Sequence, residues 1–227
     1  MDKIISFLEG RGHLPSEGSS SPEQQDYLRR LVRQSKARLV AEIGFNAGFS
    51  SLAFLSASAD VRVVSFDIGC HEVVGPAKEF VDAQYPGRHE LVLGDSARSV
   101  PGYRARHPEV SFDIVFIDGG HEYEQAREDI SNMRAMSHPG TSVVIDDLTP
   151  WFWWGEGPTR AWTEAITQKL IAPVEILKDG QLVRDIEPPG ERSWGLGHYC
   201  FDGERPRAAA LDTGLTGEHL RVKEPLT

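Results

Sequence analysis

Cysteine, basic clusters and long apolar runs are all scarce in this sequence, and each absence excludes a class of protein. The 227 residues include only two cysteines, Cys70 and Cys200; these make no disulfide framework, so we expect a reducing, cytoplasmic environment. The net charge is −10 and no block of basic residues is present, which argues against a nucleic-acid partner. No apolar run reaches the roughly 18 residues that span a membrane, so we expect no membrane partner. The N-terminus lacks the features of a secretory signal.

Short apolar runs alternate with segments of helical periodicity through most of the chain. Ser21-Pro22 has the pattern of a helix start, and Asp179-Gly180 that of a hairpin turn. Strands that alternate with helices predict an α/β fold, a Rossmann-like, doubly wound, mostly parallel sheet of seven strands with an antiparallel C-terminal hairpin. The expected strands before the hairpin are 39–43, 61–66, 90–93, 113–117 and 142–145, and the expected helices beside them include 49–58, 76–84 and 123–133.

The domain organisation follows from composition. Residues 1–21 are expected to form an N-terminal segment that ends in a mobile Gly- and Ser-rich loop, 22–201 a single domain, and 202–227 a polar C-terminal tail.

A glycine-bearing turn follows the first expected strand. Its spacing, Gly44-x-x-x-Gly48 after Glu42, departs from the G-x-G-x-x-G pattern that places a pyrophosphate at a helix N-terminus. An acid at this point would repel a pyrophosphate and would suit a positively charged ligand, such as the amino group of S-adenosylmethionine. Asp67 ends the next strand, where it could accept hydrogen bonds from the ribose hydroxyls of either NAD or S-adenosylmethionine.

Two later strand ends gather carboxylates and an imidazole. Asp118 and His121 follow the strand 113–117, and Asp146-Asp147 follow the strand 142–145. Asp118, Asp146 and Asp147 are hard oxygen ligands that suit Mg²⁺. Such a cation would help a hydroxyl to lose its proton and would orient it. His121 is the better candidate for the base that removes this proton, and Asp118 is the competing one. His121 could instead cap the following helix.

Taken together, these motifs resemble the class I S-adenosylmethionine-dependent methyltransferases, most closely the small-molecule O-methyltransferase branch with the signature I-D-G-G-H-x-Y. That branch includes macrolide-sugar enzymes and, more distantly, catechol-type enzymes. The resemblance implies that Glu42 and Gly44 border the methionine part of the cofactor, and that Asp95 and Ser96 border the adenine. It also allows a homo-oligomer, because relatives are often dimers or larger. The full set of expected cofactor-binding residues is Glu42, Gly44, Asn46, Gly48, Ser50, Asp67, Asp95, Ser96 and Asp118.

Four consecutive aromatic residues, 151–154, follow directly after the Asp pair. Bounded by Pro150 and Gly155, they fit neither a strand nor a helix period, so we expect a loop that either walls a pocket for a flat or glycosyl acceptor or packs as a lid.

The sequence therefore predicts Mg²⁺-dependent transfer of a methyl group from S-adenosylmethionine to a hydroxyl of a small molecule, such as a sugar or phenolic group of a natural product. An N-methyltransferase on the same scaffold is the nearest alternative. An NAD(P)-dependent oxidoreductase is disfavoured by Glu42 and the glycine spacing. A metal-dependent hydrolase is the remaining alternative, but it would not explain the acids and glycines at the first three strand ends.

Overall fold

A mixed sheet of eight strands runs through the part of the chain that this computed structural model describes, residues 2–13 and 20–201. The strand order is β3-β2-β1-β4-β5-β8-β6-β7. The predicted Rossmann-like α/β class is confirmed, with eight strands in place of seven because β8 (Ser193–Tyr199) adds to the five strands and the hairpin that the sequence predicts. The expected tail 202–227, and residues 14–19 of the expected mobile loop, lie outside the described residues.

The chain divides into two compact units, residues 1–114 and 115–227, and each is described by itself. The boundary falls inside β4 (Phe112–Ile117). Among the described helices of both units, none combines the length and the apolar character that crossing a membrane requires.

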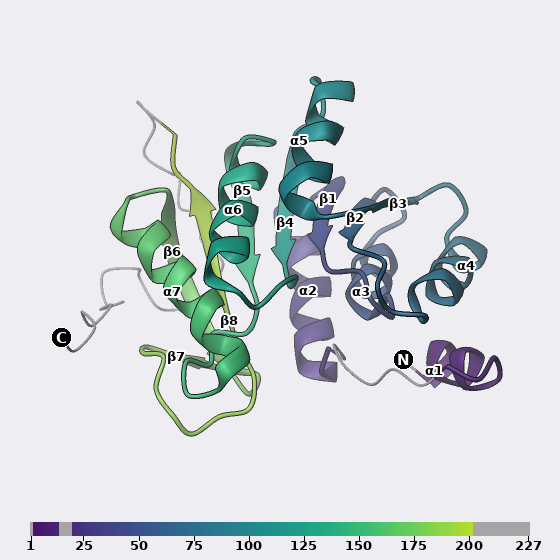
Figure 1. Ribbon diagram of the computed structural model, residues 1–227, viewed down its shortest axis with the longest axis horizontal. Coiled ribbons are helices and arrows are strands. Elements are labelled where there is room, and N and C mark those ends of the chain that lie inside the picture. Colours follow the sequence, from purple (N-terminus) through teal and green to yellow (C-terminus); the bar gives the residue numbers. More distant parts are fainter. Residues whose placement is uncertain (1, 14–19, 202–227) are drawn as a thin grey trace. The chain divides into compact units, whose positions relative to one another are not determined.

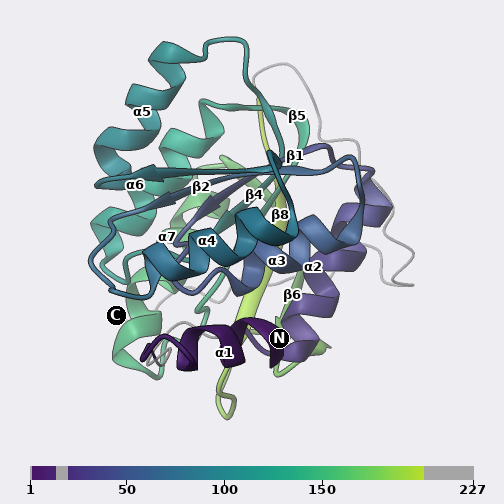
Figure 2. The ribbon, with the colours of Figure 1, turned by 90° about the vertical axis from the view of Figure 1, so that its right-hand side faces the viewer.

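The first unit is built on three parallel strands. β1 pairs with β2, and β2 with β3. In Figure 2, α5 lies on one face of these strands and α3 and α4 on the other, as in a doubly wound sheet. The strands are β1 (Leu39–Ile43), β2 (Arg62–Asp67) and β3 (His89–Leu93), and the helices are α1 (Asp2–Glu9), α2 (Pro22–Ser35), α3 (Phe49–Ala57), α4 (Val74–Gln84) and α5 (Ser96–Arg106).

Local sequence explains where two of these helices lie. The predicted start of α2 is confirmed, since the Ser21 side chain accepts a hydrogen bond of 3.2 Å from the backbone N–H of Gln24. The apolar positions of α1 recur at helical spacing, and Phe7 on this helix contacts Phe80 of α4 with 5.2 Å between ring centroids. This contact fixes α1 on the outer side of α4.

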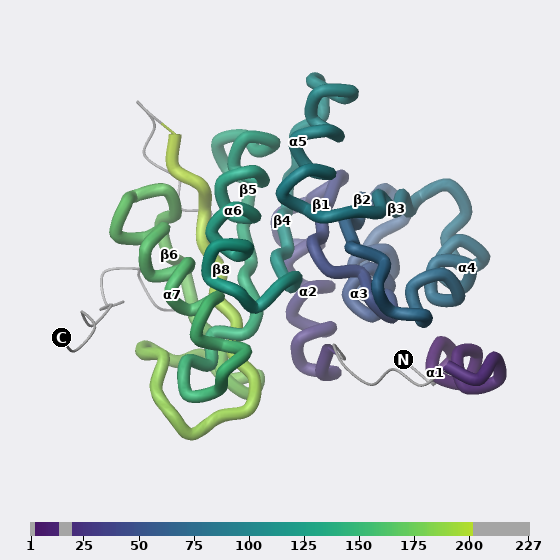
Figure 3. Tube along the Cα trace, viewed as in Figure 1, coloured from purple at the N-terminus to yellow at the C-terminus, as the bar shows by residue number. Residues whose placement is uncertain are grey.

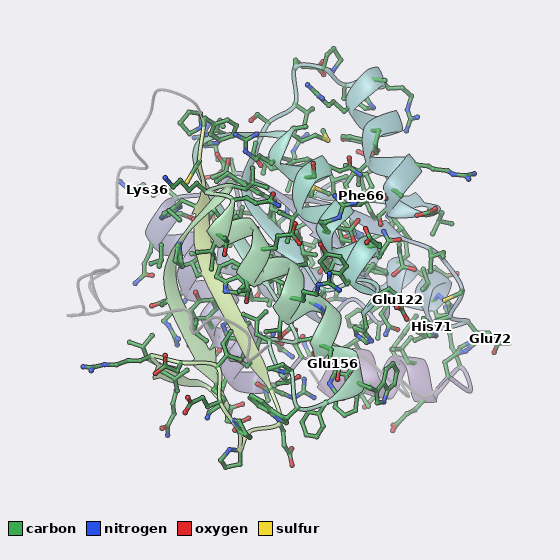
Figure 4. The ribbon with its side chains drawn as sticks, turned by 60° about the vertical axis from the view of Figure 1, so that its left-hand side comes forward. Lys36, Phe66, His71, Glu72, Glu122 and Glu156 are labelled. Atoms are coloured by element: carbon green, nitrogen blue, oxygen red, sulfur yellow. The ribbon has the colours of Figure 1, made fainter. Side chains whose placement is uncertain are left out.

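The sequence did not reveal α5, which follows β3. Pro101 and Gly102 lie inside it and interrupt its helical pattern. Tertiary contacts compensate, because Val100 and Tyr103 are buried and the Tyr103 ring meets Phe66 of β2 edge to face at 5.5 Å. Figure 4 labels Phe66, which belongs to the core of this unit.

The second unit contains the antiparallel part of the sheet. β8 pairs with β5 on one side and with β6 on the other, and β6 forms the predicted hairpin with β7 around Asp179-Gly180. Figure 3 traces the chain from this hairpin through the connection 184–192 into β8. The helices α6 and α7 lie side by side (Figure 1). The elements are α6 (Tyr123–Arg134), β5 (Ser137–Ile145), α7 (Trp153–Thr167), β6 (Ile171–Lys178), β7 (Gln181–Val183) and β8 (Ser193–Tyr199).

Glycines in β8 allow a large side chain to pack against the middle of this sheet. A β-carbon at Gly195 would lie 2.9 Å from the indole of Trp162, which is only 1% exposed. A β-carbon at Gly197 would lie 2.4 Å from Ile171 and 2.8 Å from the backbone oxygen of Ala172. The core of the second unit therefore depends on the absence of side chains at these two positions.

We expect Gly197→Ala to lower the free energy of unfolding by about 1–3 kcal/mol, the usual cost of overpacking a core. Gly75→Ala is the matched control: it lies in α4 with nothing within 4 Å of the added β-carbon, so it should be neutral or stabilising by about 0.5–1 kcal/mol. Urea denaturation of both variants checks this, and equal effects would contradict the packing argument.

Candidate functional site

The turn after β1 in the first unit departs from ordinary backbone conformation. Gly44, Asn46 and Gly48 have φ angles of 92°, 44° and 75°. Such left-handed conformations favour glycine and tolerate asparagine. Gly48 is also packed closely, because a β-carbon there would lie 3.0 Å from the Phe45 ring. The turn is therefore a fixed backbone loop at the carboxyl end of β1, where ligands of open α/β sheets bind.

Asp67, at the end of β2, holds this turn in place. Its Oδ2 accepts hydrogen bonds of 2.9 Å from the backbone N–H groups of Phe45 and Asn46, and its Oδ1 accepts one of 2.7 Å from Gly69. A carboxylate oxygen can accept more than one hydrogen bond. Ribose binding by Asp67 thus stays a prediction. The structure shows that the same carboxylate also holds the turn after β1.

Glu42 is completely buried within the same unit. Its carboxylate accepts hydrogen bonds from the hydroxyls of Ser51 and Ser65, and Ser50 also hydrogen-bonds to it. Burial raises the pKa of Glu42 from 4.5 to about 7, although the three serines oppose the shift. With 0% of its surface exposed, Glu42 would influence a bound cofactor through these serines. Its predicted place beside the methionine part stays a prediction.

His89 extends this buried network. Its Nε2 lies 2.9 Å from the Ser65 hydroxyl, and its ring stacks on Phe45 with 4.8 Å between centroids. Burial lowers the pKa of His89 to about 4, so the ring is neutral near pH 7. His89 therefore has a structural role in the core of the first unit.

The end of β3 offers polar and apolar groups together. Asp95 caps α5 by accepting a hydrogen bond of 3.0 Å from Ala97 N–H, and Ser96 is the first residue of that helix. The sequence did not single out Ile68 and Leu93, which are 66% and 62% exposed at the ends of β2 and β3. A β-carbon at Gly69 would lie 3.3 Å from Leu93, so the two loops run close together. An exposed apolar residue directly before a strand-end glycine is the signal that could have identified both side chains.

In the second unit, the structure brings His121 and Asp147 together. His121 Nε2 lies 3.1 Å from Asp147 Oδ2, and the two side chains are 40% and 27% exposed. Asp147 has a left-handed φ of 58°, a conformation that aspartate tolerates better than most residues. His121 lies directly before Glu122, which holds the N-cap position of α6. This accessible pair of a base and a carboxylate is the clearest chemical feature of the unit.

Asp118 and Asp146 lie at neighbouring strand ends. The backbone N–H of Asp146 donates a hydrogen bond of 3.0 Å to the carbonyl oxygen of Ile117, the residue before Asp118. Asp146 Oδ1 accepts one of 2.9 Å from the N–H of Asp147. Within residues 2–13 and 20–201, no three His, Cys, Asp or Glu side chains are arranged so that they could hold a metal ion. The role of these carboxylates as Mg²⁺ ligands therefore stays a prediction.

Two glycines allow the start of α7 to pack closely against the loops that follow β4 and β5. A β-carbon at Gly157 would lie 2.1 Å from the carbonyl oxygen of His121, and one at Gly155 would lie 2.2 Å from that of Thr149. Real β-carbons do not approach so closely, so glycine is required at both positions. The start of α7 thereby fixes the backbone on which His121 lies.

The aromatic segment is not the loop that the sequence predicted. The helix α7 begins at Trp153, so two of the four aromatic residues are helical. The glycines and Pro158 in this first turn hid the helix in the sequence, since neither residue favours a helix interior. Trp153 is 76% exposed, and its ring meets that of His121 edge to face at 6.2 Å.

Comparison with known proteins finds a family model that matches part of the chain and solved structures with a similar fold. Residues 41–148 match the family model described as a methyltransferase domain. An O-methyltransferase from Bacillus cereus, solved in complex with S-adenosylhomocysteine, is 18% identical, with a TM-score of 0.67 over 87% of this chain and 89% of that one. The O-methyltransferase TomG of Streptomyces achromogenes, solved with S-adenosylmethionine, is 20% identical, with a TM-score of 0.68 over 87% and 88%.

The chain carries the class I methyltransferase fold. A TDP-rhamnose 3'-O-methyltransferase of calicheamicin biosynthesis shares this methyltransferase fold at 20% identity, with a TM-score of 0.59 over 76% of this chain and 77% of that one. A protein from Mycobacterium sp. (strain JLS) that is named as an O-methyltransferase is 27% identical over 146 residues. The match covers 63% of this chain and 64% of that relative, so the chain spans less than two thirds of its length.

We expect Glu42→Gln to stabilise the fold increasingly as the pH rises. The raised pKa of Glu42 means that the folded state holds a proton more tightly than the unfolded state. The stability that this proton provides is complete below pH 4.5 and is lost as the pH rises through about 7. Glutamine stays neutral, so the gain should grow from near zero at about pH 4.5 to at most about 3 kcal/mol at about pH 8.

Urea denaturation at about pH 5 and about pH 8 measures this gain. Glu72→Gln, which neutralises an exposed carboxylate of the same unit, is the control and should change stability little at either pH. A gain for Glu42→Gln that does not depend on pH would show that the buried carboxyl is not the cause.

Proposed function

We propose that this protein transfers the methyl group of S-adenosylmethionine to a hydroxyl of a small molecule, with His121 as the base. The observation that carries the proposal is the His121–Asp147 pair, which lies on a methyltransferase fold at 3.1 Å and is accessible to solvent. The likeness to enzymes named as O-methyltransferases supports a hydroxyl acceptor over an amine.

The first unit offers features that fit the cofactor. The left-handed turn 44–48 lies at the end of β1, and the exposed apolar side chains of Ile68 and Leu93 suit the face of a flat base. Asp67 and Asp95 would bind the ribose and the adenine, as the sequence predicts. When bound, S-adenosylmethionine supplies a methyl group on a positively charged sulfur.

The second unit supplies a route for the proton. If His121 Nε2–H donates to Asp147, the imidazole lone pair resides on Nδ1, and that atom accepts the proton of the hydroxyl. The Asp147 carboxylate then stabilises the imidazolium that forms and holds its orientation. The hydroxyl oxygen forms the new bond to the methyl carbon, and the sulfur leaves as a neutral thioether.

Mg²⁺ at Asp118, Asp146 and Asp147 stays a prediction from the sequence. The described residues form no metal-binding group, and the contact between Asp147 and His121 gives this carboxylate another use. No step above depends on a metal ion.

Replacement of the base should separate chemistry from cofactor binding. We expect His121→Ala to lower kcat by about a hundredfold or more, and Asp147→Asn by about tenfold, because general-base catalysis contributes factors of this size. The affinity for S-adenosylmethionine, measured by calorimetry, should stay near that of the wild type. Unchanged turnover in His121→Ala would exclude it as the base, and binding of NAD instead of S-adenosylmethionine would overturn the proposed function.

The metal prediction has its own test. If the carboxylates hold Mg²⁺, activity is lost in EDTA and returns when Mg²⁺ is added, since a metal-bound hydroxyl loses its proton more easily. Release of S-adenosylhomocysteine is the measurement. Activity that is indifferent to EDTA would leave the His121–Asp147 pair as the sufficient base.

A further inference from the structure

Trp153 differs from the three aromatic residues beside it. Trp151 donates a hydrogen bond of 2.8 Å from its indole N–H to the carbonyl oxygen of Gly190. Phe152 and Trp154 stack with 4.4 Å between centroids and 9° between planes. All three are partly buried, whereas Trp153 is 76% exposed. The segment therefore fixes three rings and presents the fourth to solvent.

The exposed ring of Trp153 lies beside the candidate base. Its centroid is 6.2 Å from that of His121, and the two planes meet at 76°. The Trp154 ring contacts the Trp153 ring edge to face, with 5.7 Å between their centroids. The close packing of Gly155 and Gly157 holds the helix start that carries it. A large apolar ring that is exposed in a fixed position next to a base marks a surface for ligand contact.

The charged groups around this ring are mostly acidic. Glu122 follows His121 directly, and Glu156 lies three residues after Trp153, on the same side of α7; both are exposed (Figure 4). Asp147 faces His121 from the end of β5. Arg160, one turn further along α7, stacks over the Tyr123 ring at 3.8 Å. Three carboxylates near the base would repel a ligand that carries phosphate groups.

We propose that Trp153 is the surface on which the methyl acceptor stacks, and that the acceptor is an uncharged hydroxylated ring rather than a phosphate-bearing compound such as a nucleotide sugar or a coenzyme A thioester. This inference rests on the proposed methyl transfer and narrows its substrate class. The face of an aromatic or sugar ring contacts the indole, and one of its hydroxyls reaches the imidazole of His121.

Two matched pairs of probes test the substrate class. Phenyl rhamnoside is compared with TDP-rhamnose, and methyl caffeate with caffeoyl-CoA. Each pair shares the hydroxyls of its rhamnose or catechol ring, and only one member carries phosphate groups, within its nucleotide or coenzyme A part. Binding is measured by calorimetry in the presence of S-adenosylhomocysteine, and methyl transfer by the release of S-adenosylhomocysteine from S-adenosylmethionine. We expect at least one neutral member to bind about tenfold more tightly than its phosphate-bearing partner.

Variants of Trp153 test the stacking surface. Trp153→Ala should weaken binding of the neutral member, or raise its KM, by about tenfold with little change in kcat, and Trp153→Phe should recover most of the loss. Leu182→Ala, which removes an exposed apolar side chain from the β6–β7 hairpin, is the control and should change neither value. The double variant Glu122→Gln/Glu156→Gln should reduce the disadvantage of the phosphate-bearing members.

Three results would overturn the inference: equal or tighter binding of the phosphate-bearing members, no binding of either neutral probe, or unchanged acceptor affinity in Trp153→Ala. A calorimetric titration with S-adenosylmethionine alone separates this failure from failure of the proposed function. A protein that binds the cofactor but shows one of these results keeps the methyl transfer and loses only the assigned acceptor class.

Discussion

The hydrogen bonds between the Asp67 carboxylate and three backbone N–H groups are the constraint on which the strand ends of the first unit depend. They fasten the turn after β1 to the end of β2. Asp67 also accepts through its carbonyl oxygen from the N–H of Gly94, which connects the end of β3 to the same point. Three strand ends thus share one residue. A turn that contains three left-handed residues would have many alternatives in the absence of this anchor, and ordering it in advance lowers the cost of ligand binding.

In the second unit, backbone contacts take the place of a carboxylate anchor. The His121–Asp147 pair joins the loops that follow β4 and β5, and the first turn of α7 closes on both loops through Gly155 and Gly157. A half-exposed contact of this kind contributes little to stability. The geometry of the pair is therefore a result of backbone packing.

Prediction from the sequence succeeded where one residue type and a short spacing determine the outcome. Apolar runs located the strands, Ser21 the start of α2, and Asp179-Gly180 the hairpin, because each signal is local. It failed for α5 and for the start of α7, where contacts with distant residues outweigh glycine and proline in the helix. The residue types at the candidate site were visible, but their partners were not. Nothing near Glu42 in the sequence indicates that Ser65 donates a hydrogen bond to its carboxylate, and nothing near His121 indicates that Asp147 lies 3.1 Å away.

Gly157 has a consequence for how the proposed enzyme could change its substrate. Because this glycine touches the backbone of His121, the start of α7 cannot slide or tilt without moving the proposed base. A lineage that acquires a new acceptor can vary the exposed side chains at 153 and 156, but it cannot shift the helix that carries them. Substrate range can therefore drift through surface substitutions while the proton-transfer geometry is inherited unchanged.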